Sequence, residues 1–214
     1  MMKTKFQRWF CLIAAGLCMA SAVWAQPMDA KSVLDQASAR FRQAGGVEAA
    51  FTIYSEEGLF EGTIQVKGDK FVLETGNVKV WFDGHTQWTY LSSTDEVNIS
   101  IPTSEELQQL NPYALLAIYK QGYALALGKT ETLQGKAVYE VILTAKDPQA
   151  EWQRVAIWVT RDTFRPLQLS TTLQGGYDTA TIVISRYQTG LAFAGSHFVF
   201  DAKAYPTAEV VDLR

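Results

Sequence analysis

Two histidines, His85 and His197, are the only imidazole groups in the chain, and hydrolytic chemistry would have to use one of them. His85 directly follows an Asp-Gly pair, where a hairpin turn and a polar residue are expected. Ser196, His197 and Asp201 are the residue types of a catalytic triad, but neighbours along a strand cannot supply the Ser-His hydrogen bond that a triad requires. We therefore interpret both histidines as surface or strand-edge residues and expect no enzymatic activity.

Metal and cofactor chemistry has equally little support. The two histidines and the scattered carboxylates do not have the spacing of zinc or calcium ligands. Glu56-Glu57 and Glu105-Glu106 fit a turn and the start of a helix, and the sequence contains no glycine-rich phosphate loop. The sequence therefore predicts neither a metal site nor a bound cofactor.

Aromatic side chains offer a different chemistry in residues 78–101, VKVWFDGHTQWTYLSSTDEVNISI. Alternation places Val80 and Phe82 on one face of a strand, and Trp81 adds a large apolar side chain to the other face. A sheet that rests on an ordinary core needs only one apolar face. The additional apolar surface on the second face favours a cavity for an apolar ligand. Exposed rings that stack on sugars are an alternative, which fits less well because few polar groups converge beside them.

The N-terminal residues predict export. Three basic residues precede an apolar run, and Val23-Trp24-Ala25 has the form of a signal-peptide cleavage site. We expect residues 1–25 to be a secretory signal peptide, cleaved after about Ala25, and residues 26–214 to form a single domain in the periplasm. Both cysteines lie in the signal peptide, so the mature chain has no thiols for disulfides or metal binding.

The charge of the mature chain excludes one class of partner. Loss of the three basic residues in the signal peptide changes the formal net charge from −3 to −6. A mildly acidic chain lacks the basic surface that nucleic-acid binding requires. No later apolar run approaches the roughly 20 residues of a membrane-spanning helix. We therefore expect an exported monomer that binds neither nucleic acid nor a bilayer through a helix.

Periodicity predicts one helix, a long series of strands, and two further helices inserted into that series. Asp29 can cap a helix that runs to about Ala44. Thr103–Glu106 has the capping-box pattern, and Asn111-Pro112 begins another helix that is apolar on most of its circumference. The predicted strands cover residues 47–54, 60–67, 70–74, 78–82, 88–90, 97–101, 137–143, 152–159, 167–173, 179–187 and 197–200.

Together these elements predict an α+β fold. About ten to eleven strands with short connections indicate an antiparallel sheet, and a sheet of that size must curl or close. We expect a strongly curved sheet, in effect an unclosed β-barrel, whose concave face is covered by the three helices as a lid.

The order of these parts resembles the periplasmic outer-membrane lipoprotein carrier family, LolA-like, over essentially the whole mature chain. Val80–Tyr90, VWFDGHTQWTY, is similar to the family's apolar-D-G-x-x-x-W-x-Y hairpin, and Glu96-Val97 to the E-Q/E-V that follows it. Asn111–Ala117, NPYALLA, is similar to the N-x-P-hydrophobic lid helix. Ala50-Phe51-Thr52 is similar to the S-F-x-Q segment, and Phe198-Val199-Phe200 to the closing K-F-x-F strand.

The resemblance implies a carrier that shelters lipoprotein acyl chains in a hydrophobic cavity and moves them from the inner to the outer membrane. The implied ligand is a lipoprotein or another acylated molecule, and the implied partners are an inner-membrane lipoprotein-release ABC transporter and an outer-membrane acceptor. Envelope carriers of lipid or glycolipid and sensory modules share the fold and are alternatives. The expected cavity wall consists of Phe51, Ile53, Phe60, Ile64, Phe71, Val80, Phe82, Trp88 and Tyr90, and the expected lid contains Leu115, Leu116, Ile118 and Tyr119.

One motif departs from the family pattern. Lys67-Gly68-Asp69-Lys70-Phe71 stands where the family commonly has K-R-P-x-x-F, whose arginine hydrogen-bonds toward the lid and holds it closed. Phe71 matches that pattern, whereas Gly68 and Asp69 stand in place of the arginine and the proline. The resemblance therefore does not extend to this latch.

Overall fold

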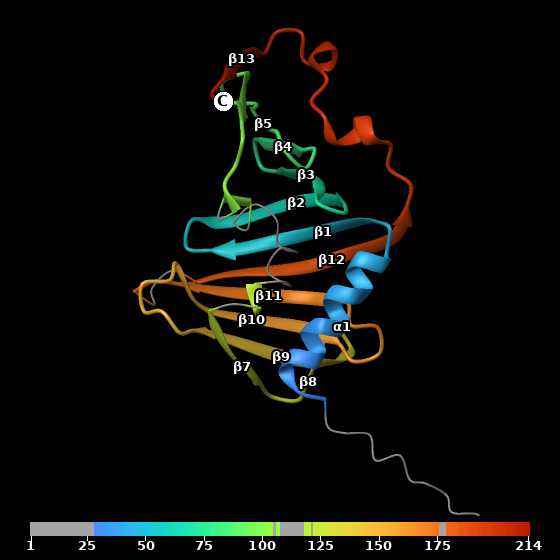
Figure 1. Ribbon diagram of the computed structural model, residues 1–214, viewed down its shortest axis with the longest axis vertical. Coiled ribbons are helices and arrows are strands. Elements are labelled where there is room, and N and C mark those ends of the chain that lie inside the picture. Colours follow the sequence, from blue (N-terminus) through green and yellow to red (C-terminus); the bar gives the residue numbers. More distant parts are fainter. Residues whose placement is uncertain (1–27, 105, 108–117, 121, 176–178) are drawn as a thin grey trace, which may run out of the picture.

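One continuous sheet organises the chain, and a long helix packs against it (Figure 1). The computed structural model describes residues 28–104, 106–107, 118–120, 122–175 and 179–214. The elements within these residues are α1 (Ala30–Gln43), β1 (Gly46–Ser55), β2 (Gly58–Lys67), β3 (Lys70–Thr75), β4 (Val78–Phe82), β5 (Gln87–Leu91), β6 (Glu96–Ser100), β7 (Tyr123–Leu127), β8 (Glu131–Leu133), β9 (Lys136–Ala145), β10 (Trp152–Thr160), β11 (Pro166–Leu173), β12 (Thr179–Leu191), the 3₁₀ helices η1 (Gly195–Phe198) and η2 (Ala202–Ala204), and β13 (Glu209–Asp212).

The sheet is antiparallel apart from one edge. Its strands follow the order β13-β6-β5-β4-β3-β2-β1-β12-β11-β10-β9-β7, with β8 also paired to β9. Only β13 and β6 run parallel among the strands described. The outermost strands, β13 and β7, lie at the two ends of this order, so the sheet is unclosed. The predicted unclosed sheet is confirmed, with thirteen strands rather than ten or eleven.

The strand predictions failed in the C-terminal region and around residue 125. The predicted strand at residues 197–200 is wrong, because residues 195–198 form η1. Phe198 is fully buried, but this segment crosses a face of the sheet rather than lying at its edge, so no neighbouring strand is available to pair with it. Its backbone bonds are local instead, such as that from the His197 amide to the Ala194 carbonyl. Three short strands, β7, β8 and β13, were not predicted.

The helix prediction is confirmed for α1 only. The Asp29 side chain accepts a 2.7 Å hydrogen bond from the Ser32 amide and caps the helix, and Gly45 ends it with φ of 74°. The described residues contain one complete α-helix instead of the predicted three. The other two fall largely on residues 105, 108–117 and 121, which lie outside the described part of the chain.

The sheet face covered by α1, here called the inner face, carries the main core. Val33, Leu34 and Ala37 of α1 are buried against it. The core is continuous from α1 across the strands on both sides of the β1–β12 pair, and it includes Ala49, Phe51, Ile64, Phe71, Leu73, Val80, Phe82, Val141, Leu143, Val155, Ile157, Val159, Leu169 and Ile184. Strand alternation explains this pattern, since residues two apart share a face.

Phe51 and Gly62 show how closely the inner face is packed. They lie opposite each other on β1 and β2, and the Phe51 ring covers the glycine. A Cβ atom at Gly62 would lie 2.6 Å from Cζ of Phe51 and 2.7 Å from the carbonyl oxygen of Glu74. Only glycine fits here, because the ring occupies the space of a side chain.

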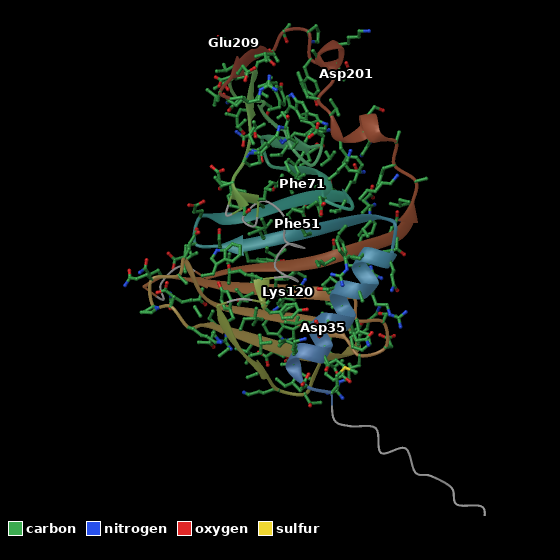
Figure 2. The ribbon with its side chains drawn as sticks, in the orientation of Figure 1. Asp35, Phe51, Phe71, Lys120, Asp201 and Glu209 are labelled. Atoms are coloured by element: carbon green, nitrogen blue, oxygen red, sulfur yellow. The ribbon has the colours of Figure 1, made fainter. Side chains whose placement is uncertain are left out.

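The chain that leaves β6 returns to the inner face. Thr103 and Glu106 form the predicted capping box, in which the Thr103 amide donates to Glu106 at 2.7 Å and the Glu106 amide donates to Thr103 at 3.3 Å. Tyr119, at the far end of this segment, is 5% exposed in the inner core, and its hydroxyl donates a hydrogen bond to Asp35 of α1. Asp35 also pairs with Lys31 at 2.6 Å. Figure 2 labels Asp35 on α1 and Lys120, the residue that follows Tyr119.

The opposite face, here called the outer face, is covered at β3–β5 by the C-terminal segment, residues 193–205. Figure 1 shows this segment leaving β12 and running along the molecule to β13 beside β6. Phe198 packs in a second apolar cluster with Val72 of β3 and Trp81 of β4. The Lys67 ammonium donates to the Phe193 carbonyl at 2.7 Å and fixes the start of the segment.

We expect Gly62→Ala to lower the free energy of unfolding by about 1–3 kcal/mol, because overpacking forces the Phe51 ring or the β3 backbone to move. The urea midpoint of unfolding measures this change. Gly195→Ala is the matched control, because a Cβ atom there would meet nothing within 4 Å. Equal midpoints for the two variants would contradict the packing described here.

The Tyr119–Asp35 contact predicts an alkaline transition. Burial, reinforced by the bond to Asp35, raises the pKa of Tyr119 from 10.0 to about 12, so the fold favours the neutral phenol. That contribution is complete below about pH 10 and is lost as the pH rises toward about 12. We expect Tyr119→Phe to cost about 1 kcal/mol at neutral pH through the lost hydrogen bond, and to lose less stability than the parent protein above pH 10.

Denaturant unfolding of both proteins at neutral and alkaline pH tests this prediction. Burial also raises the pKa of Tyr187 to about 12, so part of the alkaline loss will remain in the variant. An identical alkaline loss in the two proteins would show that Tyr119 is not held as described.

Candidate functional site

The predicted cavity wall divides into a packed part and an open part. Phe51, Ile64, Phe71, Val80 and Phe82 are all on the inner face, and each is 5% exposed or less within the main core. Figure 2 shows Phe51 on β1 and Phe71 farther along the sheet on β3. These residues are packed within the main core, so in this structure they are core residues.

Ile53 and Phe60 lie at an opening in the inner face. Ile53 pairs with Phe60 on β2 and with Ile182 on β12, and opposed residues of antiparallel strands share a face. Both isoleucines pack against the main core, whereas Phe60 is 39% exposed. The sheet therefore presents an apolar surface here that other side chains do not cover completely.

A hollow of about 580 Å³ adjoins this surface. Its volume falls in the roughly 300–1,000 Å³ range of small-molecule sites. Thr171 and Leu173 of β11 and Ala180 of β12 form a second side, and Glu56 and Glu57 of the β1–β2 turn lie at its rim. The hollow is apolar where it meets the core, and the ionisable side chains among its described lining residues are acidic, which suits the uncharged hydrocarbon part of a ligand.

Thr171, Leu173 and Ala180, which form the second side of the hollow, were not among the predicted wall residues. Leu173 continues the alternation of Leu169 and Thr171 along β11, so its face could have been predicted. The place of Ala180 could not have been predicted, because Ala180 of β12 reaches the site only through its pairing with Thr171 of β11. Only the register of β11 and β12 brings them together.

The predicted lid is only partly described. Ile118 is half-buried against the main core, and Tyr119 is buried within it. Leu107, near the start of the same segment, also packs there. Leu115 and Leu116 lie outside the described residues. Both described ends of this segment therefore rest on the inner face, and the Tyr119–Asp35 bond ties one of them to α1.

Trp88 and Tyr90 were predicted to line the cavity, and that prediction is wrong. Trp88 pairs directly with Trp81, and both residues belong to the outer-face cluster. The connection after Phe82 contains four residues, so the returning strand places Gln87 and Thr89, not the aromatic residues, on the inner face. The Tyr90 hydroxyl donates to Asp95 at 3.1 Å, and its ring lies 4.7 Å from that of Tyr205.

The outer-face cluster accounts for the surplus aromatic surface. Trp81 is 6% exposed, and its ring lies 5.5 Å from Phe200 and 5.6 Å from Tyr205. Trp158, which would also have to be free in a sugar-stacking platform, is half-buried and donates to Glu131. The aromatic residues of β4 and β5 therefore hold the C-terminal segment and do not form an open platform.

The histidines occupy structural positions. His85 lies exposed in the β4–β5 turn, where its amide donates to Asp83. The His197 ring is bonded to Gln65 at 2.7 Å and stacks on Phe193. Among the residues described, no group of three or more histidine, cysteine or acidic side chains could hold a metal ion. No helix in the same part of the chain is long and apolar enough to cross a membrane.

Comparison with solved structures finds the same fold in a protein from Thermus thermophilus. An uncharacterized conserved protein from Thermus thermophilus superposes with a TM-score of 0.61 at 14% identity, covering 86% of this chain and 98% of the other. A putative outer membrane lipoprotein-sorting protein domain from Vibrio parahaemolyticus gives 0.47 at 13% identity, covering 79% and 95%. A LolA superfamily protein from Nitrosomonas europaea gives 0.41 at 14% identity, covering 82% and 99%.

Sequence comparison identifies the family. No curated protein matches this chain. The family profile described as outer membrane lipoprotein carrier protein LolA matches residues 21–174, which is more than half of the sequence. The chain therefore belongs to the LolA outer membrane lipoprotein carrier family.

Proposed function

We propose that this protein is a non-enzymatic periplasmic carrier that binds an acyl chain of a lipoprotein at the inner face. The observation that carries the proposal is the apolar hollow between Ile53, Phe60 and Leu173, which adjoins the main core of a LolA-family fold. Family membership favours a lipoprotein as the ligand. Burial of a hydrocarbon chain contributes about 0.8 kcal/mol per CH₂ group, so partial shelter of one chain gives useful affinity.

The hollow accommodates only part of such a ligand while the rest of the inner face is packed. A longer acyl chain would have to displace side chains that now cover the core, and those of the segment after β6 include Leu107, Ile118 and Tyr119. The Tyr119–Asp35 hydrogen bond would then break. We propose that this contact holds the apolar face closed in the absence of ligand, where the family commonly uses an arginine that this chain lacks.

The remaining parts of the proposal follow from the sequence and the family. The predicted signal peptide supports delivery to the periplasm as a single-domain monomer. Loading by an inner-membrane lipoprotein-release transporter and delivery to an outer-membrane acceptor would complete the transfer. A lipid or glycolipid carrier of the same fold would use the same hollow, and the experiments below distinguish these cargoes.

Phe60 and Leu59 provide a matched pair for testing the site. They are consecutive in β2, so their side chains lie on opposite faces, and both are exposed, at 39% and 58%. We expect Phe60→Glu to weaken binding of a triacylated lipopeptide by about tenfold or more, because a carboxylate would enter an apolar site. Leu59→Glu should bind like the parent protein. Fluorescence titration measures both, and equal affinities would exclude the hollow as the binding site.

Native mass spectrometry identifies the cargo. The protein purified from its own periplasm without detergent should contain a population heavier by one lipoprotein or lipid, and detergent should remove the added mass. A lipoprotein mass would support the carrier named here, and a lipid or glycolipid mass would support the alternative. A bare polypeptide mass that does not change after incubation with either ligand would contradict both.

A further inference from the structure

A second hollow, of about 510 Å³, lies at the opposite end of β11 and β12 from the apolar hollow. The last turns of α1, the start of β9, the β10–β11 turn and the end of β12 surround it. Three cationic side chains line it, namely Arg40, Lys136 and Arg165, together with a single carboxylate, Asp162. None of the three cations forms an ion pair with any residue that the structure describes. The lining therefore has a positive excess in a chain whose net charge is −3.

Arg165 is fixed in place but incompletely bonded. One terminal nitrogen donates to the carbonyl of Tyr187 at 2.9 Å, and the guanidinium lies 4.5 Å from the centre of the Tyr187 ring. Its Nε is buried and has no hydrogen-bond partner among the described residues. Buried donors without an acceptor are uncommon in folded proteins. An oxyanion in the hollow would instead accept charge-assisted bonds from the terminal N–H groups of Arg165 that the Tyr187 carbonyl does not use.

The turn that presents Arg165 is held by a buried hydroxyl. Thr160 is fully buried, and its hydroxyl is bonded to that of Thr163 at 2.7 Å and accepts the Arg165 amide at 3.1 Å. Phe164 has a left-handed backbone with φ of 55°, which is unusual for a bulky residue, and its ring stacks on Tyr139. The turn therefore sets the position of Arg165 before any ligand binds.

The chemistry of the lining indicates the kind of anion. Cations from three separate elements and the hydroxyl of Thr189 offer donors from several directions, which suits the several acceptor oxygens of a phosphate better than the two of a carboxylate. Phe41 and Phe164 add apolar walls for a carbon substituent. We propose that this hollow binds the phosphate group of a phosphate ester.

The proposal does not depend on acyl-chain binding, since the two hollows lie at opposite ends of β11 and β12. The phosphate could belong to a free ester or to the headgroup of a phospholipid. Two probes separate these sources, glycerol 3-phosphate in solution and phosphatidic acid in phosphatidylcholine vesicles. Calorimetry measures the first, and co-sedimentation measures the second against vesicles of phosphatidylcholine alone.

The variants are chosen so that the fold stays intact. Arg165 is left unchanged because its bond to Tyr187 also holds the turn. We expect Arg40→Gln and Lys136→Gln each to weaken binding about tenfold, the usual effect of losing one charge-assisted hydrogen bond. Arg42→Gln is the matched control, because Arg42 lies in the same last turn of α1 but lines a different hollow. Asp162→Asn should strengthen binding severalfold, because it removes the only negative charge in the lining.

Each outcome decides the question. Saturable binding of glycerol 3-phosphate with this order of variants supports a site for a soluble ester. Binding of phosphatidic acid vesicles alone, with the same order, supports a headgroup site. Absence of binding to both probes would overturn the proposal, and so would binding that Arg42→Gln weakens as much as Arg40→Gln or that Asp162→Asn does not strengthen.

Discussion

The β3–β4 region of the sheet is apolar on both faces, and the arrangement of the rest of the molecule depends on this. Val80 and Phe82 are buried on the inner face, while Val72 and Trp81 are buried on the outer face. Because exposed apolar surface is unfavourable in water, each face requires its own cover. Side chains of α1 and of the segment after β6 cover the inner face, and residues 193–205 cover the outer face. The chain beyond β12 is therefore a structural part of the fold and not an appendage.

This double cover explains which parts of the structure could be predicted from sequence. The α1 helix and the capping box at Thr103 were predictable because their caps are local signals. The faces of β1 to β4 were predictable from alternation. The expected faces of Trp88 and Tyr90 were wrong even though a two-residue Asp83-Gly84 turn, like the observed four-residue connection, has an even number of residues and places both rings on the face opposite to that of Phe82. Phe198 and Phe200 alternate as in a strand, but alternation indicates burial on one side and not pairing with a neighbour.

The candidate site was predictable as a surface but not as a cavity. The sequence identified Ile53 and Phe60 as inner-face residues, and both line the hollow. It could not show that Phe51 and Phe71, which follow the same alternation, would be covered by other side chains and become core residues. Whether an inward residue becomes core or cavity wall depends on side chains brought together across β1, β2, β11 and β12. The family match ends at residue 174, so β12 and the whole outer cover lie beyond it.

The pairing of β1 with β12 has a consequence for how the molecule is made. One of the two neighbours of β1 in the sheet is β12, which is nearly the last strand in the sequence. The segment that covers Trp81, residues 193–205, comes after β12. A chain that emerges from its N-terminus, during synthesis or passage through a membrane, cannot join the two halves of the sheet until residues 179–191 are available. Until then the edge of β1 and the outer face of β3–β5, with Trp81 and Trp88, stay uncovered, and such surfaces promote aggregation. The protein must therefore be kept apart from its neighbours during that interval, and its folding can finish only after nearly all of the chain has emerged.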